Sequence, residues 1–131
     1  MYSVNNEKIF TEPNVAIFTH NGLTCVVLRM PHSGTLNGYV GLPETHELYR
    51  EHYTDGQMYF DVHGGVTYSD MGLHNIEIFD NLWFIGFDTN HSCDKAPIMP
   101  ESMGITRDGT YKDFDYVKKE TIKLADQLNN C

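Results

Sequence analysis

Short apolar runs separated by turn residues dominate the chain up to residue 87, and this pattern is typical of β-strands. The clearest pair is Val15–His20 and 23–28, which are joined by Asn21-Gly22. Because Asn and Gly tolerate the positive φ angles of a tight turn, we expect a β-hairpin here. Further strands are expected at 38–42, at 58–62 with a continuation at 66–68 beyond a bulge, at 76–79 and at 82–87. The last two flank Asp80-Asn81 and predict a second tight hairpin, while residues 43–49 suit one or two helical turns.

The last apolar pattern of the chain has the spacing of an α-helix. Residues 113–128 place apolar side chains three and four positions apart, which makes one stripe along a helix, and Asp113 or Asp115 can cap its start. The stripe consists of Val117, Thr121, Leu124, Ala125 and Leu128. It has to be buried, and the sheet is the only large partner. The sequence therefore predicts an α+β fold, a mainly antiparallel sheet of five to seven strands with one long C-terminal helix packed on a face.

Length and charge narrow the range of functions. With 131 residues, the chain is expected to form a single domain spanning 1–131. Its net charge of −9 is concentrated in residues 44–94, which contain ten acidic residues and one basic residue. Without a basic patch we expect no direct binding of nucleic acid. The acidic segment is a solvated face, a cation site, or a surface that meets something basic.

The compartment follows from three further features of the sequence. No apolar run approaches the roughly 20 residues that span a bilayer, so no membrane contact is expected. The first ten residues lack the basic and apolar regions of a signal peptide. Cys25, Cys93 and Cys131 are odd in number and far apart, which fits neither zinc spacing nor a disulfide framework. We therefore expect a cytoplasmic protein.

Candidate catalytic or metal-binding residues occur at two polar breaks, that is, at two places where polar residues follow an apolar segment. Asp88, His91 and Asp94 come directly after the aromatic strand 82–87 and are three residues apart. A loop or a single 3₁₀ turn can point side chains at this spacing in one direction. Polar residues at the end of a buried strand are a common way to hold a site on a rigid element.

The second break begins at His63. The adjacent Gly64 and Gly65 permit the close approach of another backbone or of a ligand, and Thr67 is placed to contact a phosphate or a water. We expect His63 and His91 to lie near each other at the end of the sheet.

Three interpretations of these residues remain open. Imidazole nitrogens and carboxylate oxygens suit zinc, manganese or iron, which makes His63, Asp88, His91 and Asp94 candidate ligands of a divalent metal. The same four residues are catalytic candidates without a metal, because a His beside an Asp is a competent general acid or base near neutral pH. In the third interpretation, the two aspartates stabilise turns and His91 only hydrogen-bonds one of them.

Several short motifs together suggest a family. They are Gly38-Tyr39-Val40, His63-Gly64-Gly65-x-Thr67-Tyr68, Trp83-x-x-Gly86-Phe87-Asp88-x-x-His91-x-x-Asp94, Thr110-Tyr111 and Tyr116-Val117-x-x-Glu120-x-x-x-Leu124-Ala125-x-Gln127-Leu128. Over roughly residues 38–128 the chain resembles a group of small uncharacterised proteins of bacteriophages and prophages. The resemblance implies a phage context, and hence the host cell cytoplasm, without implying an activity.

Two functions compete at this point. The first is a hydrolase or binder of a phosphorylated small molecule or nucleotide, which uses the His/Asp site with or without zinc or manganese. The alternative is a non-catalytic acidic protein that blocks a basic surface of a host protein, as an inhibitor of host defence or a DNA mimic. A site needs a few polar residues gathered together, whereas mimicry needs carboxylates spread over an exposed face.

Overall fold

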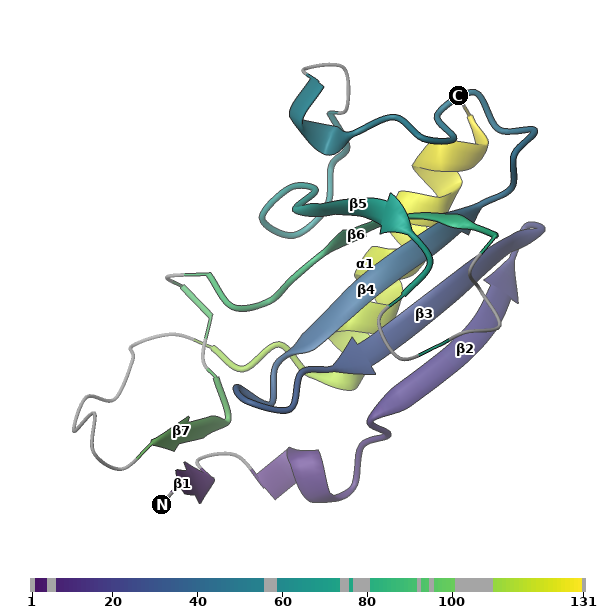
Figure 1. Cartoon of the computed structure of the whole chain (residues 1–131). Helices are drawn as coiled ribbons and strands as arrows, with labels where there is room; N and C mark the ends of the chain where they lie inside the picture. The colour runs from purple at the N-terminus through teal and green to yellow at the C-terminus, as the bar shows by residue number, and fades with distance from the viewer. Residues whose placement is uncertain are drawn as a thin grey trace.

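A five-stranded antiparallel sheet with one helix on a face forms the body of the computed structural model (Figure 1). The model describes residues 2–4, 7–55, 59–73, 76, 81–91, 93–94, 96–100 and 110–130. The strand order across the sheet is β2 (Val15–His20), β3 (Leu23–Arg29), β4 (Leu36–Leu42), β6 (Trp83–Phe87) and β5 (Tyr68–Met71). A small second sheet pairs β1 (Tyr2–Val4) with β7 (Ile98–Pro100), and two 3₁₀ helices, η1 (Glu7–Phe10) and η2 (Tyr53–Asp55), precede β2 and β5. The predicted α+β fold is thus confirmed.

The first hairpin forms as the sequence predicts. β2 and β3 pair from Val15 opposite Leu28 to His20 opposite Leu23, which leaves a two-residue turn. The two turn residues, Asn21 and Gly22, have φ angles of 50° and 84°. Both angles lie in the left-handed region that this turn requires.

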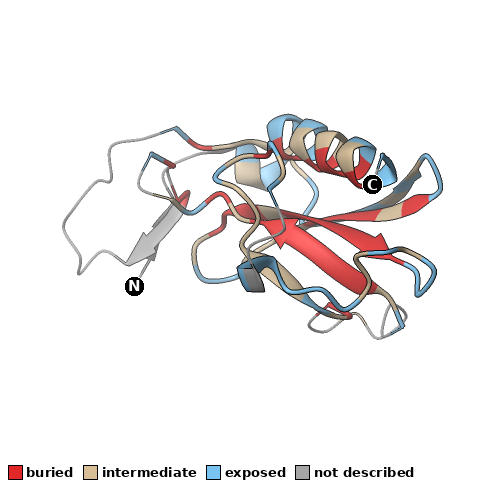
Figure 2. Ribbon diagram, turned by 90° about the horizontal axis from the view of Figure 1, so that it is seen from above, coloured by how far each residue is buried: buried red, intermediate tan, exposed pale blue. Residues whose placement is uncertain are grey.

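The helix α1 (Phe114–Asn129) covers one face of the sheet, as Figure 2 shows from above. Asp113 caps it, because an oxygen of its side chain accepts a hydrogen bond from the Tyr116 backbone N–H at 3.0 Å. The five residues of the predicted apolar stripe are all buried. They pack on the inward side chains of β3, β4 and β6, among them Val27, Val40 and Ile85. The opposite face carries a smaller buried cluster of Val26, Tyr39, Leu73 and Phe84.

Three local predictions were wrong. Residues 59–62 form no strand, because the Asp61 backbone instead bonds to the Gln127 side chain of α1 through both its N–H and its C=O, at 2.7 and 2.9 Å. Residues 43–49 form hydrogen-bonded turns rather than a helix. β6 pairs with β5, although the predicted strand ended at residue 68 and residues 69–71 were expected to be a loop. Of the expected strand 76–79, Ile76 makes an isolated bridge to Leu73, and residues 77–79 lie outside the described residues.

Candidate functional site

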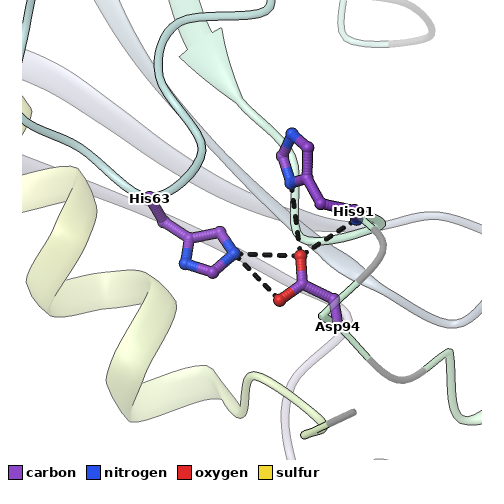
Figure 3. A group of neighbouring side chains, drawn as sticks. All are labelled: His63, His91 and Asp94. Carbon is purple, nitrogen blue, oxygen red and sulfur yellow. Dashed lines mark hydrogen bonds and ion pairs between the residues drawn. The ribbon is translucent and has the colours of Figure 1, made fainter. Parts of the chain in front are cut away.

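His63, His91 and Asp94 meet beside the end of β6, close to the first half of α1 (Figure 3). His63 lies in the loop before β5, and the other two lie in the loop after β6. The imidazole rings of His63 and His91 are 5.7 Å apart between centroids. The expectation that the two histidines lie near each other is therefore confirmed.

The carboxylate of Asp94 is the centre of this group. Its side chain is fully buried, and both of its oxygens lie 2.9 Å from Nε2 of His63. One oxygen, Oδ2, also accepts the backbone N–H of His91 at 3.0 Å and lies 3.2 Å from Nδ1 of that ring. Burial alone raises the pKa of Asp94, but the hydrogen bonds from the two histidines outweigh it, so the pKa lies below its ordinary value.

A cation that sequence reasoning did not single out lies beside this carboxylate. The Lys112 ammonium is 3.4 Å from Oδ1 of Asp94, and its side chain is only 17% exposed. It also donates to the Thr110 carbonyl at 3.2 Å and lies 5.9 Å from the centroid of the Tyr116 ring. The buried negative charge of Asp94 is therefore balanced by a lysine that is 18 residues away in the sequence.

Helix α1 fixes the position of His63 through two polar residues. The Tyr116 hydroxyl lies 2.8 Å from Nδ1 of His63, and the backbone N–H of His63 donates to Oε1 of Glu120 at 2.9 Å. Tyr116 and Glu120 are four residues apart, so they face the same side of the helix. Sequence reasoning missed both residues as contributors to the site, although a polar pair next to the apolar stripe is a signal for this role.

His91 packs against a glycine of the other loop. A Cβ atom added to Gly64 would lie 2.4 Å from Cε1 of His91, and Gly64 has a φ of +66°. The neighbouring Gly65 also has a positive φ, of +78°, but a Cβ added there would meet nothing within 4 Å. The two predicted ligand-binding glycines thus differ, since only a Cβ added at Gly64 would meet the cluster.

Asp88 and Thr67 lie at the margin of the site. One Asp88 oxygen accepts the Thr67 hydroxyl at 3.0 Å. The other accepts the Asn90 backbone N–H at 3.0 Å and is 3.4 Å from Nδ1 of His91. Asp88 therefore stabilises a turn and supports His91. Among the described residues, the ligating atoms that lie within 4.8 Å of one another belong to His63, His91 and Asp94.

This donor set has the composition of a catalytic metal centre. Two imidazole nitrogens and one carboxylate oxygen suit zinc, and three protein ligands leave a fourth position for water or substrate. Tetrahedral zinc at roughly 2.0–2.2 Å from its ligands separates them by about 3.3 Å. The histidine nitrogens lie 2.9 and 3.2 Å from Asp94, so a small outward shift would admit the ion.

No family model, curated protein or solved structure matches this chain. Among the residues that the model describes, no helix has the length and apolar character needed to cross a membrane.

Proposed function

We propose that the protein is a metal-dependent hydrolase of phosphorylated small molecules or nucleotides, in which His63, His91 and Asp94 hold a zinc or manganese ion. The observation that carries the proposal is the convergence of two histidines, from two separate loops, on the buried carboxylate of Asp94. Metal ligands have to be deprotonated, so a bound ion would take the place of the protons that now lie between these hydrogen-bonded side chains.

The surrounding residues suit such a centre. A bound divalent ion would lower the pKa of its water toward neutral pH and so supply a nucleophile. The Tyr116 hydroxyl contacts the ring nitrogen of His63 that faces away from Asp94, which orients Nε2 toward the site. Asp88 supports His91 from the other side. The proposed substrate class rests on Lys112, whose ammonium now faces Asp94 and would be available to a phosphate group once an ion neutralised that carboxylate.

Metal analysis tests the first part of this proposal. The protein is purified without chelator, its metal content is measured by mass spectrometry, and the metal-free form is titrated with zinc and manganese. We expect one equivalent per chain, and loss of binding in His63→Ala and His91→Ala. The exposed His32 is a matched control, because His32→Ala removes an imidazole in a turn elsewhere.

Thermal unfolding with and without EDTA provides a second measurement. An ion present at about 100 times its dissociation constant stabilises the fold by roughly 2.7 kcal/mol, which raises the melting temperature by several degrees. EDTA should abolish this increase in the wild type and have no effect on His91→Ala. The metal centre would be refuted if the wild type and His91→Ala have the same melting temperature both with and without EDTA.

Hydrolysis of a panel of phosphate monoesters and nucleotides tests the substrate class. We expect activity that requires the metal and is lost in His91→Ala. Activity that survives EDTA but not His91→Ala would instead identify a metal-free general base, with Asp94 orienting the imidazole. The acidic interaction protein would be favoured if no hydrolysis is found and the chain inhibits a host protein even after any single one of its own carboxylates is removed. The phage context proposed from the motifs puts the expected substrate or target in the host cytoplasm.

A further inference from the structure

We infer that the outer edge of β2 is a self-association surface, on which a second copy of this chain adds its own β2 in antiparallel orientation. The inference is independent of the proposed activity. Figure 1 shows β2 at one margin of the five-stranded sheet. Within the described part of the chain, β3 is the only strand that pairs with β2.

The backbone of β2 alternates between paired and outward-facing groups. In an antiparallel pair, every second residue exchanges hydrogen bonds with the partner strand. The Arg29 N–H donates to the Asn14 carbonyl at 2.8 Å, and the two-residue turn makes His20 and Leu23 a hydrogen-bonded pair. The even-numbered positions of β2 therefore bond to β3. The odd-numbered residues Val15, Ile17 and Thr19 direct their N–H and C=O groups away from the sheet.

The side chains of the odd positions make this edge apolar. Val15 and Ile17 are 48% and 49% exposed, whereas Ala16 and Phe18 pack into the core beneath α1. Phe10, just before the strand, is 71% exposed. Pairing of two β2 strands would align the odd side chains of both copies on the same face, where cross-strand apolar pairs stabilise a sheet.

The uncharged sequence of β2 makes a second copy a suitable occupant despite the net charge. Each chain carries a net charge of −9, so two copies repel unless their contact keeps the acidic residues apart. Residues 13–28 contain no Asp, Glu, Lys or Arg, and the Asp126 carboxylate at the end of β2 lies 2.7 Å from Nε2 of His20. An identical neutral strand also supplies matching backbone groups, and antiparallel self-pairing about a twofold axis forms a closed dimer.

The opposite edge of the sheet differs in the features that discourage pairing. β5 has four residues, and among them Asp70 is exposed. The Tyr53 N–H donates to the Ser69 side chain at 3.0 Å, which ties a neighbouring loop to that strand. Short length and an exposed charge are the usual protections of an edge strand, and β2 has neither of them.

Sedimentation equilibrium of the full chain tests the inference. We expect the average mass to rise from 15.0 kDa toward twice that value with concentration. Ile17→Lys should weaken association at least tenfold by placing two ammonium groups at the contact. Thr19→Pro should do the same while keeping the apolar side chains, because it removes an outward N–H that β3 does not use. Tyr59→Lys is the matched control, since Tyr59 is 86% exposed in a loop and should leave association unchanged.

Amide hydrogen exchange identifies the surface directly. In the monomer, the amides of Val15, Ile17 and Thr19 should exchange fast while those of Ala16 and Phe18 are protected. At high concentration the odd-numbered amides should become protected too. The inference is overturned if the wild type stays monomeric to about 1 mM, a limit of roughly 4 kcal/mol in binding. The inference is also overturned if dimerisation is unaffected by Ile17→Lys, or if the odd-numbered amides of the dimer still exchange fast.

Discussion

Replacing Gly64 or Gly65 with alanine separates the backbone requirements of this loop from its role in the site. Both residues have left-handed φ angles, of +66° and +78°. Alanine in that region costs about 1–2 kcal/mol, and the stiffer unfolded chain offsets roughly 0.4–1 kcal/mol of this cost. We therefore expect Gly65→Ala to destabilise the fold by about 1 kcal/mol, which lowers the melting temperature by roughly 3–6 °C.

Gly64→Ala carries the same backbone cost and in addition displaces His91. The new Cβ would lie 2.4 Å from Cε1 of the imidazole, whereas ordinary contact begins at 3.4 Å, so the ring has to move by about 1 Å. Functional side chains tolerate displacements of only about 0.5 Å. We therefore expect Gly64→Ala to weaken zinc binding by about 10-fold to 100-fold, as the loss of a supporting contact does in other metal sites.

Isothermal titration with zinc and thermal unfolding, measured for both variants, decide the matter. Gly65→Ala should bind zinc like the wild type despite its lower melting temperature. Gly64→Ala should show a similar or larger decrease in melting temperature and much weaker binding. If the two variants bind zinc equally, His91 is not held by Gly64 in the way the structure indicates, and its part in the metal site is refuted.

Three other predictions follow from the same structure. Because the pKa of Asp94 is below its ordinary value, its contribution to stability is present above pH ~4 and is lost as pH falls through the folded-state pKa. In urea unfolding, the free energy of unfolding of Asp94→Asn should therefore fall less steeply with decreasing pH than that of the wild type. An unchanged slope would contradict the hydrogen bonds to His63 and His91. Lys112→Met should tighten zinc binding by about 10-fold, or ~1.4 kcal/mol, by removing a cation 3.4 Å from a ligand oxygen, and a titration showing weaker binding would exclude this competition. Leu124→Ala should cost about 2–5 kcal/mol in chemical denaturation, because Leu124 is fully buried between α1 and the sheet, and a loss below 1 kcal/mol would mean that the helix is not a core element.

The sequence by itself determined the elements whose signals are local. Asn21-Gly22 specified a hairpin because both residues accept positive φ, and this preference does not depend on the rest of the chain. The apolar spacing from Val117 to Leu128 specified α1 and its buried face, since a stripe at helical period has to be covered. The sequence offered Asp113 or Asp115 as the N-cap, and in the structure it is the Asp113 side chain that accepts the Tyr116 backbone N–H.

Strand pairing was decided by the tertiary structure. Residues 59–62 have the composition of a strand, yet the Gln127 side chain satisfies the Asp61 backbone from a helix 66 residues away. β6 pairs with β5, whose residues 69–71 were expected to be a loop. Hydrophobic periodicity identifies candidate strands, but it carries no information on which segments pair with each other.

The candidate site divides in the same way. The sequence indicated His63, His91 and Asp94 from their places at polar breaks, but not that Asp94 would be fully buried or that Asp88 would lie outside the cluster of three. Tyr116, Glu120 and Lys112 became part of the site only when α1 and the segment before it packed beside the loops. Hydrogen bonds between distant segments depend on the approach of whole elements, and that approach is set by burial of the shared core rather than by any local pattern.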